Sequence, residues 1–334
     1  MIIKNKKILV TGGAGFIGSH ICERLLKEGA EVVVLDDFST GKIDNLKKIK
    51  SLIKIIRGDI LDDKAVKKAT NGCDAIIHQA FPYGKSGMGL DNQYVRAGTE
   101  GTFNILREAV KSGVKKFIFA STASVYGIVP KYPPIDEKYR TKSFLLYGST
   151  KLCGENFCST ISDLYGLDTT VLRYFYVYGP RYSVFDHSAM VNFINLALRG
   201  KPILIYGKGD QLRDYTYIED VVEATILALK NESTKEKIYN ISSGFNTSIS
   251  DLAATIVRLT NSKSEIKAAS HTQYRYIDYC RIPIGITSKK DNQWIDERNY
   301  IADISLAKKE LGYFPKISLE DGILKTVNWM SKKI

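Results

Sequence analysis

A tyrosine and a lysine stand four residues apart in the stretch YGSTK, at Tyr147 and Lys151. On a helix, residues i and i+4 share a face, so the two side chains would point the same way. A phenol with a pKa of about 10 is a poor base at neutral pH. A neighbouring ammonium group favours the phenolate and lowers that pKa. The pair is therefore either a common helix-surface pair or a catalytic base with its electrostatic partner.

A glycine-rich turn lies early in the chain, in TGGAGFIGSH at residues 11–20. Such a turn between a strand and a helix lets a pyrophosphate approach the backbone, and its last glycine lets the helix and strand pack closely. It satisfies two overlapping patterns, GxGxxG and GxxGxxG, through Gly12, Gly13, Gly15 and Gly18. Asp36 follows at the end of a second apolar run, where a carboxylate would bond ribose hydroxyls and repel a 2′-phosphate. These features predict NAD rather than NADP, and they favour the catalytic interpretation of YGSTK.

Two further polar groups follow apolar runs. Thr122 lies in FASTASVYG at 119–127, and Asp59 lies in GDI at 58–60. Ligands of an open parallel sheet bind at the carboxyl ends of its strands, so the Thr122 hydroxyl would bond the reacting oxygen. The alternative is a turn that caps its own backbone. Asp59 would either meet the adenine edge or serve as a helix N-cap.

Short apolar runs alternate with longer amphipathic stretches through the first half of the chain. We expect strands, buried on both faces, at 6–12, 30–37, 52–59, 73–80, 115–122 and 168–175. We expect helices at 16–29, 98–113 and 149–166. This alternation predicts an α/β fold with a Rossmann-type, doubly wound parallel sheet over residues 1–180.

After about residue 180 the alternation of apolar runs and amphipathic stretches becomes less regular. We expect residues 181–334 to form a smaller, mixed α/β lobe that binds the substrate, with chain crossings between this lobe and the first domain. Its one expected strand is at 201–207. Its expected helices are at 187–200, 218–230, 249–260, 304–313 and 319–333. Residues 262–300 are polar and are predicted to be irregular.

Composition narrows the class of protein. The chain has 334 residues, of which 44% are apolar and 25% charged, as in a soluble globular protein. Apolar runs are too short for a membrane span or a signal peptide, so we expect a cytoplasmic protein without membrane contact. Five cysteines without a CxxC and four dispersed histidines argue against disulfides and a metal site. The net charge of +12 is spread along the chain, which disfavours nucleic acid and suits an anionic small molecule.

In combination, several motifs resemble those of the extended short-chain dehydrogenases/reductases, in their nucleotide-sugar epimerase/dehydratase branch, which includes UDP-glucose 4-epimerases. The resemblance covers nearly the whole chain. It is carried by TGGAGFIGSH, LDDFSTG (35–41), GDI, STASVYG (121–127), YGSTK, LRYFYVYGPRY (172–182), GKGDQLRDYTYIEDV (207–221), YNISSG (239–244) and ADISLAKKELGY (302–313).

The resemblance implies a role for each matching residue. Tyr147 would be the catalytic base, Lys151 its partner and ribose anchor, and Thr122 the hydroxyl beside the substrate oxygen. NAD would be held by Gly12, Gly15, Phe16, Ile17, Gly18, Asp36, Asp37, Ser39, Thr40, Gly41, Asp59, Ile60, Ala80 and Lys151. The nucleotide-sugar, most simply a UDP-sugar, would contact Thr122, Ser124, Tyr147, Tyr176, Arg181, Arg213 and Arg298. A guanidinium fork matches phosphate oxygens, which suits Arg213 to the diphosphate.

The reaction is predicted from the residues after Thr122. Related dehydratases and decarboxylases carry acidic residues there, whereas this chain has Ala123 and Ser124. Their absence favours 4-epimerisation of a UDP-hexose, because that reaction needs no further proton shuttle. The alternatives are a dehydratase, 3,5-epimerase or ketoreductase of the same family, or a non-catalytic NAD-binding regulator. Tyr176 and Gly98 stand where the family often has Asn. A homodimer through helices at 91–112 and 148–165 is common in the family.

Overall fold

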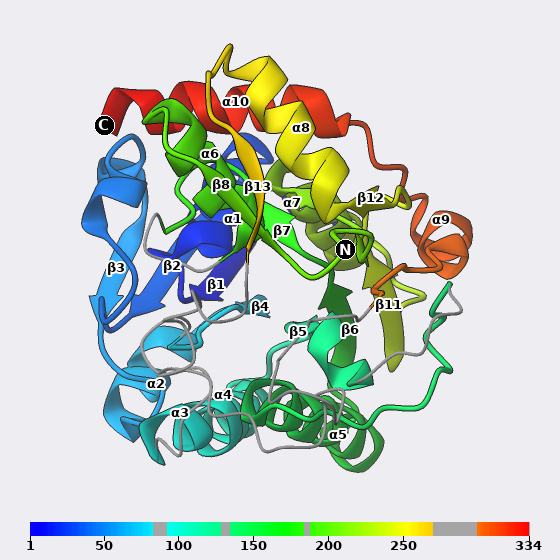
Figure 1. Cartoon of the computed structure of the whole chain (residues 1–334). Helices are drawn as coiled ribbons and strands as arrows, with labels where there is room; N and C mark the ends of the chain where they lie inside the picture. Colours follow the sequence, from blue (N-terminus) through cyan, green and yellow to red (C-terminus); the bar gives the residue numbers. More distant parts are fainter. Residues whose placement is uncertain (83–91, 128–133, 184–187, 270–298, 334) are drawn as a thin grey trace.

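The computed structural model describes residues 1–82, 92–127, 134–183, 188–269 and 299–333 (Figure 1). Its centre is a seven-stranded parallel sheet in the order β11-β6-β5-β4-β1-β2-β3. The strands are β1 (Lys7–Thr11), β2 (Glu31–Asp36), β3 (Lys54–Arg57), β4 (Ala75–His78), β5 (Lys116–Thr122), β6 (Asp168–Tyr174) and β11 (Lys237–Ile241). The six predicted strands of the first half are confirmed, and so is the α/β fold class.

Both faces of this sheet are buried, which explains why its strands read as continuous apolar runs. Ile8 and Val10 of β1 pack into the core on one face, and Leu9 packs into the core on the other. In β5, Ile118 faces the first core, whereas Phe117 lies in the second. Successive side chains of a strand point to opposite faces, so most residues of a doubly covered strand are apolar. The buried polar residues Ser121 and Thr122 stand at the carboxyl end of β5.

Helices cover the two faces of the sheet in separate layers (Figure 1). On one face, α1 (Phe16–Lys27) packs beside α7 (Ile218–Lys230). The other face carries α2 (Asp63–Thr70), α4 (Thr102–Lys111) and α5 (Leu146–Tyr165). A short helix, α3 (Asn92–Arg96), and a π-helical turn at Ala97–Gly101 lead into α4. Single 3₁₀ turns occupy Ile43–Leu46, Lys50–Leu52, Ala123–Tyr126 and Ser331–Lys333.

The second half of the chain adds a smaller, mixed layer. Its two-stranded ladders are β7 (Val177–Tyr178) with β10 (Thr216–Tyr217), β8 (Ile203–Tyr206) with β13 (Ile266–Ala269), and β9 (Leu212–Arg213) with β12 (Thr247–Ser248). Figure 1 shows α6 (Ala189–Leu198), α8 (Ile249–Leu259) and α10 (Leu319–Met330) gathered around β8 and β13. The remaining helix is α9 (Ser305–Leu311). The predicted strand and helices of this half are confirmed.

The second half of the chain contains strands that the sequence pattern did not place. β11 crosses back and pairs with β6 at the edge of the central sheet. The division into units 1–180 and 181–334 stays a prediction. The expectation of irregular structure over 262–300 is wrong at β13, because pairing with β8 makes a strand of four mostly exposed residues that lack an apolar pattern. The rest of that stretch, 270–298, lies outside the described residues.

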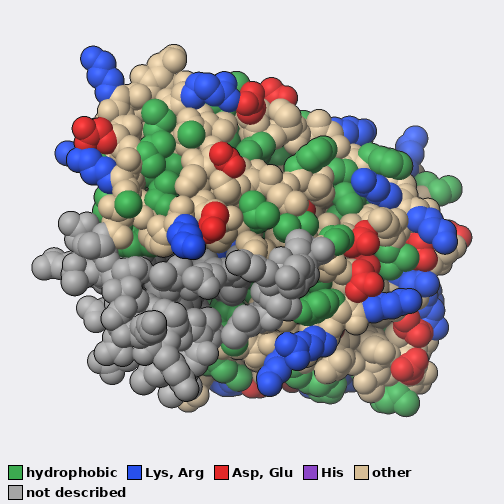
Figure 2. Space-filling view, turned by 45° about the vertical axis from the view of Figure 1, so that its right-hand side comes forward, with side chains coloured by type: hydrophobic (Ala, Val, Ile, Leu, Met, Phe, Trp, Pro, Cys, Tyr) green, Lys and Arg blue, Asp and Glu red, His purple; other side chains and the backbone are tan. Residues whose placement is uncertain are grey.

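Surface and chemical features follow from the described part of the chain. Figure 2 shows a face on which basic and acidic side chains are interspersed rather than gathered into one basic patch. Cys22, Cys73, Cys153 and Cys158 are free thiols, and Cys280 is outside the described residues. Across the described ranges, no group of three or more His, Cys, Asp or Glu is arranged to hold a metal ion. None of the helices described is both long and apolar enough to cross a bilayer.

Candidate active site

The glycine turn connects β1 to α1 in a backbone shape that larger residues would disturb. Gly12 has φ +67°, in the left-handed region, and a Cβ there would lie 2.8 Å from the Ala80 backbone. A Cβ on Gly18 would collide with the Gly12 carbonyl, so helix and turn touch closely. The N-cap of α1 is Gly15, which has no side-chain cap, and the first turn holds no acidic residue. The free amide groups at this helix start therefore have neither a side-chain cap nor an acidic residue of the first turn as a partner.

Asp36 ends β2 beside this turn. One carboxylate oxygen accepts from the Ala14 amide and the other from the Phe38 amide, both at 2.8 Å. Burial raises the pKa of the Asp36 carboxyl, and these two amides oppose that rise. A Cβ on Gly41 would lie 2.7 Å from the same carboxylate, so the following loop folds back onto it. Asp37 is exposed and bonds only the Ser39 amide.

Asp59 and Ile60 follow β3 at the same edge of the sheet. One Asp59 carboxylate oxygen accepts from the Leu61 amide at 2.9 Å. The N-cap alternative for Asp59 is wrong, because the next helix begins at Asp63 and is capped by Asp62. The Ile60 side chain is buried against the π-helical turn before α4, where a Cβ on Gly101 would lie 2.5 Å from it. The Ile60 carbonyl accepts from the Asn104 side chain at 3.2 Å.

Three predicted catalytic residues come from two adjoining elements. Thr122 ends β5, whereas Tyr147 and Lys151 lie one turn apart at the start of α5. The Lys151 ammonium donates to the Ala120 carbonyl at 2.8 Å, two residues before Thr122. A Cβ on Gly148 would lie 2.5 Å from the Ser124 carbonyl, so the first turn of α5 abuts the 3₁₀ turn after β5. The start of α5 and the end of β5 thus lie together, and they carry the three residues predicted to be catalytic.

Lys151 lies in an apolar setting. Its ammonium is 4.9 Å from the ring centroid of Phe81 and 5.0 Å from that of Phe119. Burial lowers the pKa of Lys151 to about 7. Phe81 also contacts the Tyr147 ring edge-to-face at 5.1 Å. Phe81 therefore orders both catalytic candidates, and sequence reasoning missed it, although an aromatic residue directly after the β4 run was the available signal.

Gly98 explains one departure from the family pattern. A Cβ at this position would lie 2.6 Å from the Thr150 side chain and 2.9 Å from the Phe81 ring. The backbone of the π-helical turn therefore approaches α5 too closely for a side chain. With Phe81 in this position, Asn would not fit at residue 98.

Arg213, in the second half of the chain, is a buried cation. Arg213 lies on β9, is 4% exposed, and donates to the Leu212 carbonyl at 2.9 Å. Its guanidinium is 5.4 Å from the centroid of the Tyr176 ring. Tyr176 has φ +33°, and its ring also meets Tyr215 and Tyr300 edge-to-face. A tyrosine in the left-handed region is strained, and such strain concentrates at functional sites.

The other two predicted substrate arginines are placed differently. Arg181 donates to Ser19 at 3.1 Å and forms an ion pair with Glu23, both on α1. These contacts join Arg181 to α1. Arg298 lies outside the described residues.

Comparison with known proteins decides the family. The model of the NAD dependent epimerase/dehydratase family matches residues 8–242. The chain belongs to this family. It is 35% identical to a UDP-glucuronate 4-epimerase of Thermodesulfobacterium geofontis, over 98% of this chain and 96% of that protein. It is 34% identical to a UDP-N-acetyl-alpha-D-glucosaminuronate decarboxylase of Bacillus cytotoxicus, over 97% of each chain.

Solved structures of the epimerase/dehydratase family share the whole fold. A UDP-glucose 4-epimerase of Thermotoga maritima, crystallised with UDP-glucose, superposes with a TM-score of 0.85 at 31% identity, covering 98% of this chain and 99% of that one. A UDP-glucuronic acid 4-epimerase of Bacillus cereus, in complex with UDP-glucuronic acid and NAD, gives 0.83 at 31% identity, over 98% and 100%.

The residues of this epimerase/dehydratase fit NAD. At Gly12, Gly13 and Gly18 the turn leaves no room for a Cβ, and the uncapped start of α1 suits a pyrophosphate. The Asp36 carboxylate retains acceptor capacity for ribose hydroxyls, since each oxygen bonds one amide. Ala80 touches Gly12, as its predicted place beside the cofactor requires. Phe16, Ile17, Ser39 and Thr40 lie on the same helix start and loop.

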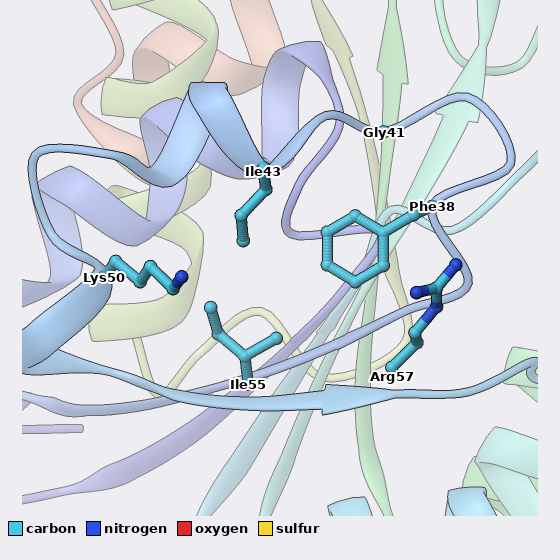
Figure 3. Close-up of a pocket in the computed structure, with 6 residues that line it drawn as sticks. All are labelled: Phe38, Gly41, Ile43, Lys50, Ile55 and Arg57. Atoms are coloured by element: carbon cyan, nitrogen blue, oxygen red, sulfur yellow. The ribbon is translucent and has the colours of Figure 1, made fainter.

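A cavity of about 510 Å³ opens beside this cofactor loop (Figure 3). Phe38 and Gly41 of the loop line it, facing Arg57 of β3. Ile43, Lys50 and Ile55 complete the lining. The Arg57 guanidinium lies 5.6 Å from the Phe38 ring centroid, and Arg57 pairs in register with Asp36. The cavity therefore adjoins the end of the site where the NAD ribose is predicted.

Proposed function

We propose that this protein is an NAD-dependent 4-epimerase of a nucleotide-sugar, with a UDP-hexose as the substrate. One observation carries the proposal: the turn of α5 with Tyr147 and Lys151 abuts the end of β5 with Thr122, beside a glycine turn that fits NAD. The full-length likeness to UDP-sugar 4-epimerases at 31–35% identity supports it.

Each side chain has a defined task in this mechanism. Tyr147, as phenolate, takes the proton of the sugar 4-hydroxyl, and the Lys151 ammonium stabilises the phenolate. The Thr122 hydroxyl donates a hydrogen bond to the same substrate oxygen. NAD, when bound, supplies reversible hydride acceptance. The 4-keto sugar then rotates to present its other face, where C4 would regain the hydride. Tyr147 returns the proton to the oxygen, so the product is the C4 epimer with no net redox change.

The residues after Thr122 support epimerisation over the other family reactions. Ala123 and Ser124 carry no group that titrates near neutral pH, and the Thr122 hydroxyl bonds the Ser124 amide at 3.2 Å. Dehydration and decarboxylation need a further acid or base beside the sugar. A 3,5-epimerase would need a second proton carrier as well. Arg213 in the second lobe would hold the diphosphate through its guanidinium fork.

The proposal is tested by product analysis. The enzyme is incubated separately with UDP-glucose, UDP-glucuronate, UDP-N-acetylglucosamine and a GDP-, CDP- and dTDP-sugar, and products are followed by proton NMR. The expected result is an equilibrium mixture of C4 epimers without accumulation of reduced cofactor. A keto sugar, loss of water, or release of carbon dioxide from the uronate would instead assign a dehydratase, ketoreductase or decarboxylase.

A homodimer through α4 and α5 is part of the proposal. Phe103 of α4 is 40% exposed and contacts Phe157 of α5, with ring centroids 5.7 Å apart. Leu164 and Tyr165 of α5 are also exposed apolar residues. Adjacent apolar side chains on neighbouring helices suit burial against a second copy. Phe103→Glu should convert a dimer to a monomer in sedimentation velocity, and a monomeric wild-type protein would contradict this assembly. A cytoplasmic location stays a prediction.

A further inference from the structure

A buried ion pair lies one helical turn below the proposed catalytic pair. Glu155 of α5 and Arg173 of β6 have side chains only 3% and 4% exposed. The pair is bidentate, with Arg173 Nε donating to Glu155 Oε1 at 3.0 Å and Nη2 to Oε2 at 2.6 Å. The proposed proton transfer uses neither residue.

The ion pair connects several elements of the site. The Ser121 hydroxyl of β5 donates to Glu155 Oε1. Arg173 Nη1 donates to the Tyr126 hydroxyl at 2.9 Å, and that hydroxyl donates to Asn240 Oδ1 of β11 at 2.6 Å. Ser121, Arg173 and Asn240 are register partners across the three strands. The cluster thus joins α5, β5, β6, β11 and the 3₁₀ turn that carries Ser124.

Two consecutive residues of β5 are fixed to α5 in this way. Ala120 accepts from Lys151, and Ser121 donates to Glu155. Thr122 is the next residue of the strand. Since Glu155 follows Lys151 by four residues, both side chains lie on the same helix face. The two bonds therefore set how far the first turn of α5 stands from the Thr122 hydroxyl.

Stability alone does not account for this cluster. A buried ion pair roughly balances its desolvation cost, and well-packed apolar residues of similar volume often serve as well. Charged, bidentate bonds do fix geometry, because the guanidinium fork accepts one orientation of its partner. We propose that Glu155 is a positioning residue, which Arg173 orients and which holds the Tyr147–Lys151 turn in register with Thr122. This inference rests on the proposed function.

The charge of Glu155 also affects a measurable quantity, the pKa of Lys151. The groups that face Lys151 are Glu155 and Cys158 on α5 and His78 on β4. Burial raises the pKa of the Cys158 thiol and lowers that of His78 to about 3, so both are neutral. Tyr147, a turn earlier on α5, shares the Phe81 ring with Lys151. The charged groups of the cluster are therefore Glu155, which raises the pKa of Lys151, and Arg173 behind it.

The main test replaces the carboxylate with a side chain of the same shape, in Glu155→Gln. With one oxygen lost as an acceptor for the guanidinium, the α5 turn should shift relative to Thr122. We expect kcat to fall by about 10- to 100-fold, because small misplacements of reacting groups cost that much. KM should stay within about twofold, as expected when only transition-state interactions are lost. NAD content and sugar product should be unchanged.

A matched control lies at the other end of the same two strands. Lys116 of β5 and Asp168 of β6 form an ion pair at 2.8 Å and are register partners. Asp168→Asn should lower the melting temperature and leave kcat within about twofold. If Glu155→Gln does not fold, Ser121→Ala decides, since it removes one bond and leaves the ion pair intact. A loss of kcat at unchanged melting temperature supports the positioning role, and full kcat in Ser121→Ala overturns it.

A measurement without turnover completes the test. Lysine side chains labelled with ¹³C at Cε are titrated by NMR, with Lys151 assigned from Lys151→Arg. Glu155→Gln should lower the pKa of Lys151, whereas Asp168→Asn should leave it unchanged. Wild-type kcat in Glu155→Gln, or a kcat loss that merely follows melting temperature as in the control, overturns the inference. A wild-type enzyme that epimerises no nucleotide-sugar refutes the proposed function instead, so the two failures are distinguishable.

Discussion

The two ends of β5 and β6 carry the same chemistry with different consequences. At the carboxyl ends, Arg173 and Glu155 form a buried ion pair beneath Thr122 and Lys151. At the amino ends, the buried Lys116 pairs with the partly exposed Asp168, supported by the Thr234 hydroxyl and the Asn231 carbonyl. Only the carboxyl edge also receives the glycine turn and Asp36. An ion pair by itself therefore does not indicate a functional site. The edge of the sheet at which it lies is the better indicator.

The largest contrast is expected for Tyr147→Phe. Losing the phenolic base should lower kcat by about 10²–10⁴-fold. The Phe81 contact and the cofactor residues stay in place, so bound NAD and melting temperature should change little. Epimer formation by NMR and NAD content after denaturation measure the two effects. Turnover close to wild type would remove the base assigned at this edge.

Asp36→Asn tests the cofactor end of the same edge. The amide nitrogen would face the Ala14 or Phe38 amide, so one donor loses its acceptor. We expect the dissociation constant for NAD to rise about tenfold, which corresponds to roughly 1.4 kcal/mol. Discrimination against NADP should also weaken, since the carboxylate no longer repels a 2′-phosphate. Isothermal titration with both cofactors measures this, and unchanged discrimination would exclude Asp36 as the determinant.

A pH series compares the buried lysines of the two edges. The pKa of Lys151 falls to about 7 in the fold and is about 10.4 in an unfolded chain. Between these values only the unfolded state binds the proton, so this lysine makes stability rise with pH by about 1.4 kcal/mol per unit. The stability of wild type relative to Lys151→Met should therefore increase from pH 7 to 9 in urea unfolding without NAD. Lys116→Met should show a smaller change, because Asp168 opposes the lowering of the Lys116 pKa by burial.

The smallest effect on activity is expected for Asp168→Asn. Lys116 would keep its bonds to Thr234 and Asn231 but lose a charged partner. The expected cost is about 1–3 kcal/mol of unfolding free energy, as for a hydrogen bond to a charged group. Denaturant unfolding and steady-state kinetics measure the two quantities on one preparation. A kcat loss beyond about twofold would show that the amino edge also acts on the chemistry.

Local sequence patterns accounted for most of the central fold. Five of the six strands of the first half are mostly buried, so each is an apolar run in the sequence. The sixth, β3, lies at the sheet edge with Lys54 and Arg57 exposed, and its two isoleucines still mark it. β11 follows a helix in the second half, and its place beside β6 depends on a long-range crossover that no local pattern states. β13 is a strand because β8 supplies a partner.

The site residues also fall into two groups, those that a local sequence pattern identifies and those that depend on long-range contacts. The glycine turn and YGSTK are defined by residue types at fixed spacing along the chain, so the sequence alone was enough to identify them. The pairing of Arg181 with Glu23 depends on how the second half docks on α1, and sequence could not show it. Phe81 and Glu155 act through contacts with side chains from other elements. The roles of Phe81 and Glu155 follow from the side chains that they contact in the fold, and not from their residue types.

The crossover of β11 also bears on how the chain is made. During synthesis, β6 leaves the ribosome before β11. Chain elongation proceeds at about 5–20 residues per second, so the edge of β6 stays unpaired for several seconds. An open edge invites pairing with another chain. Tyr126 meanwhile lacks Asn240, because that acceptor arrives with β11. The nascent first half is therefore a candidate client for holding chaperones until its last strand emerges.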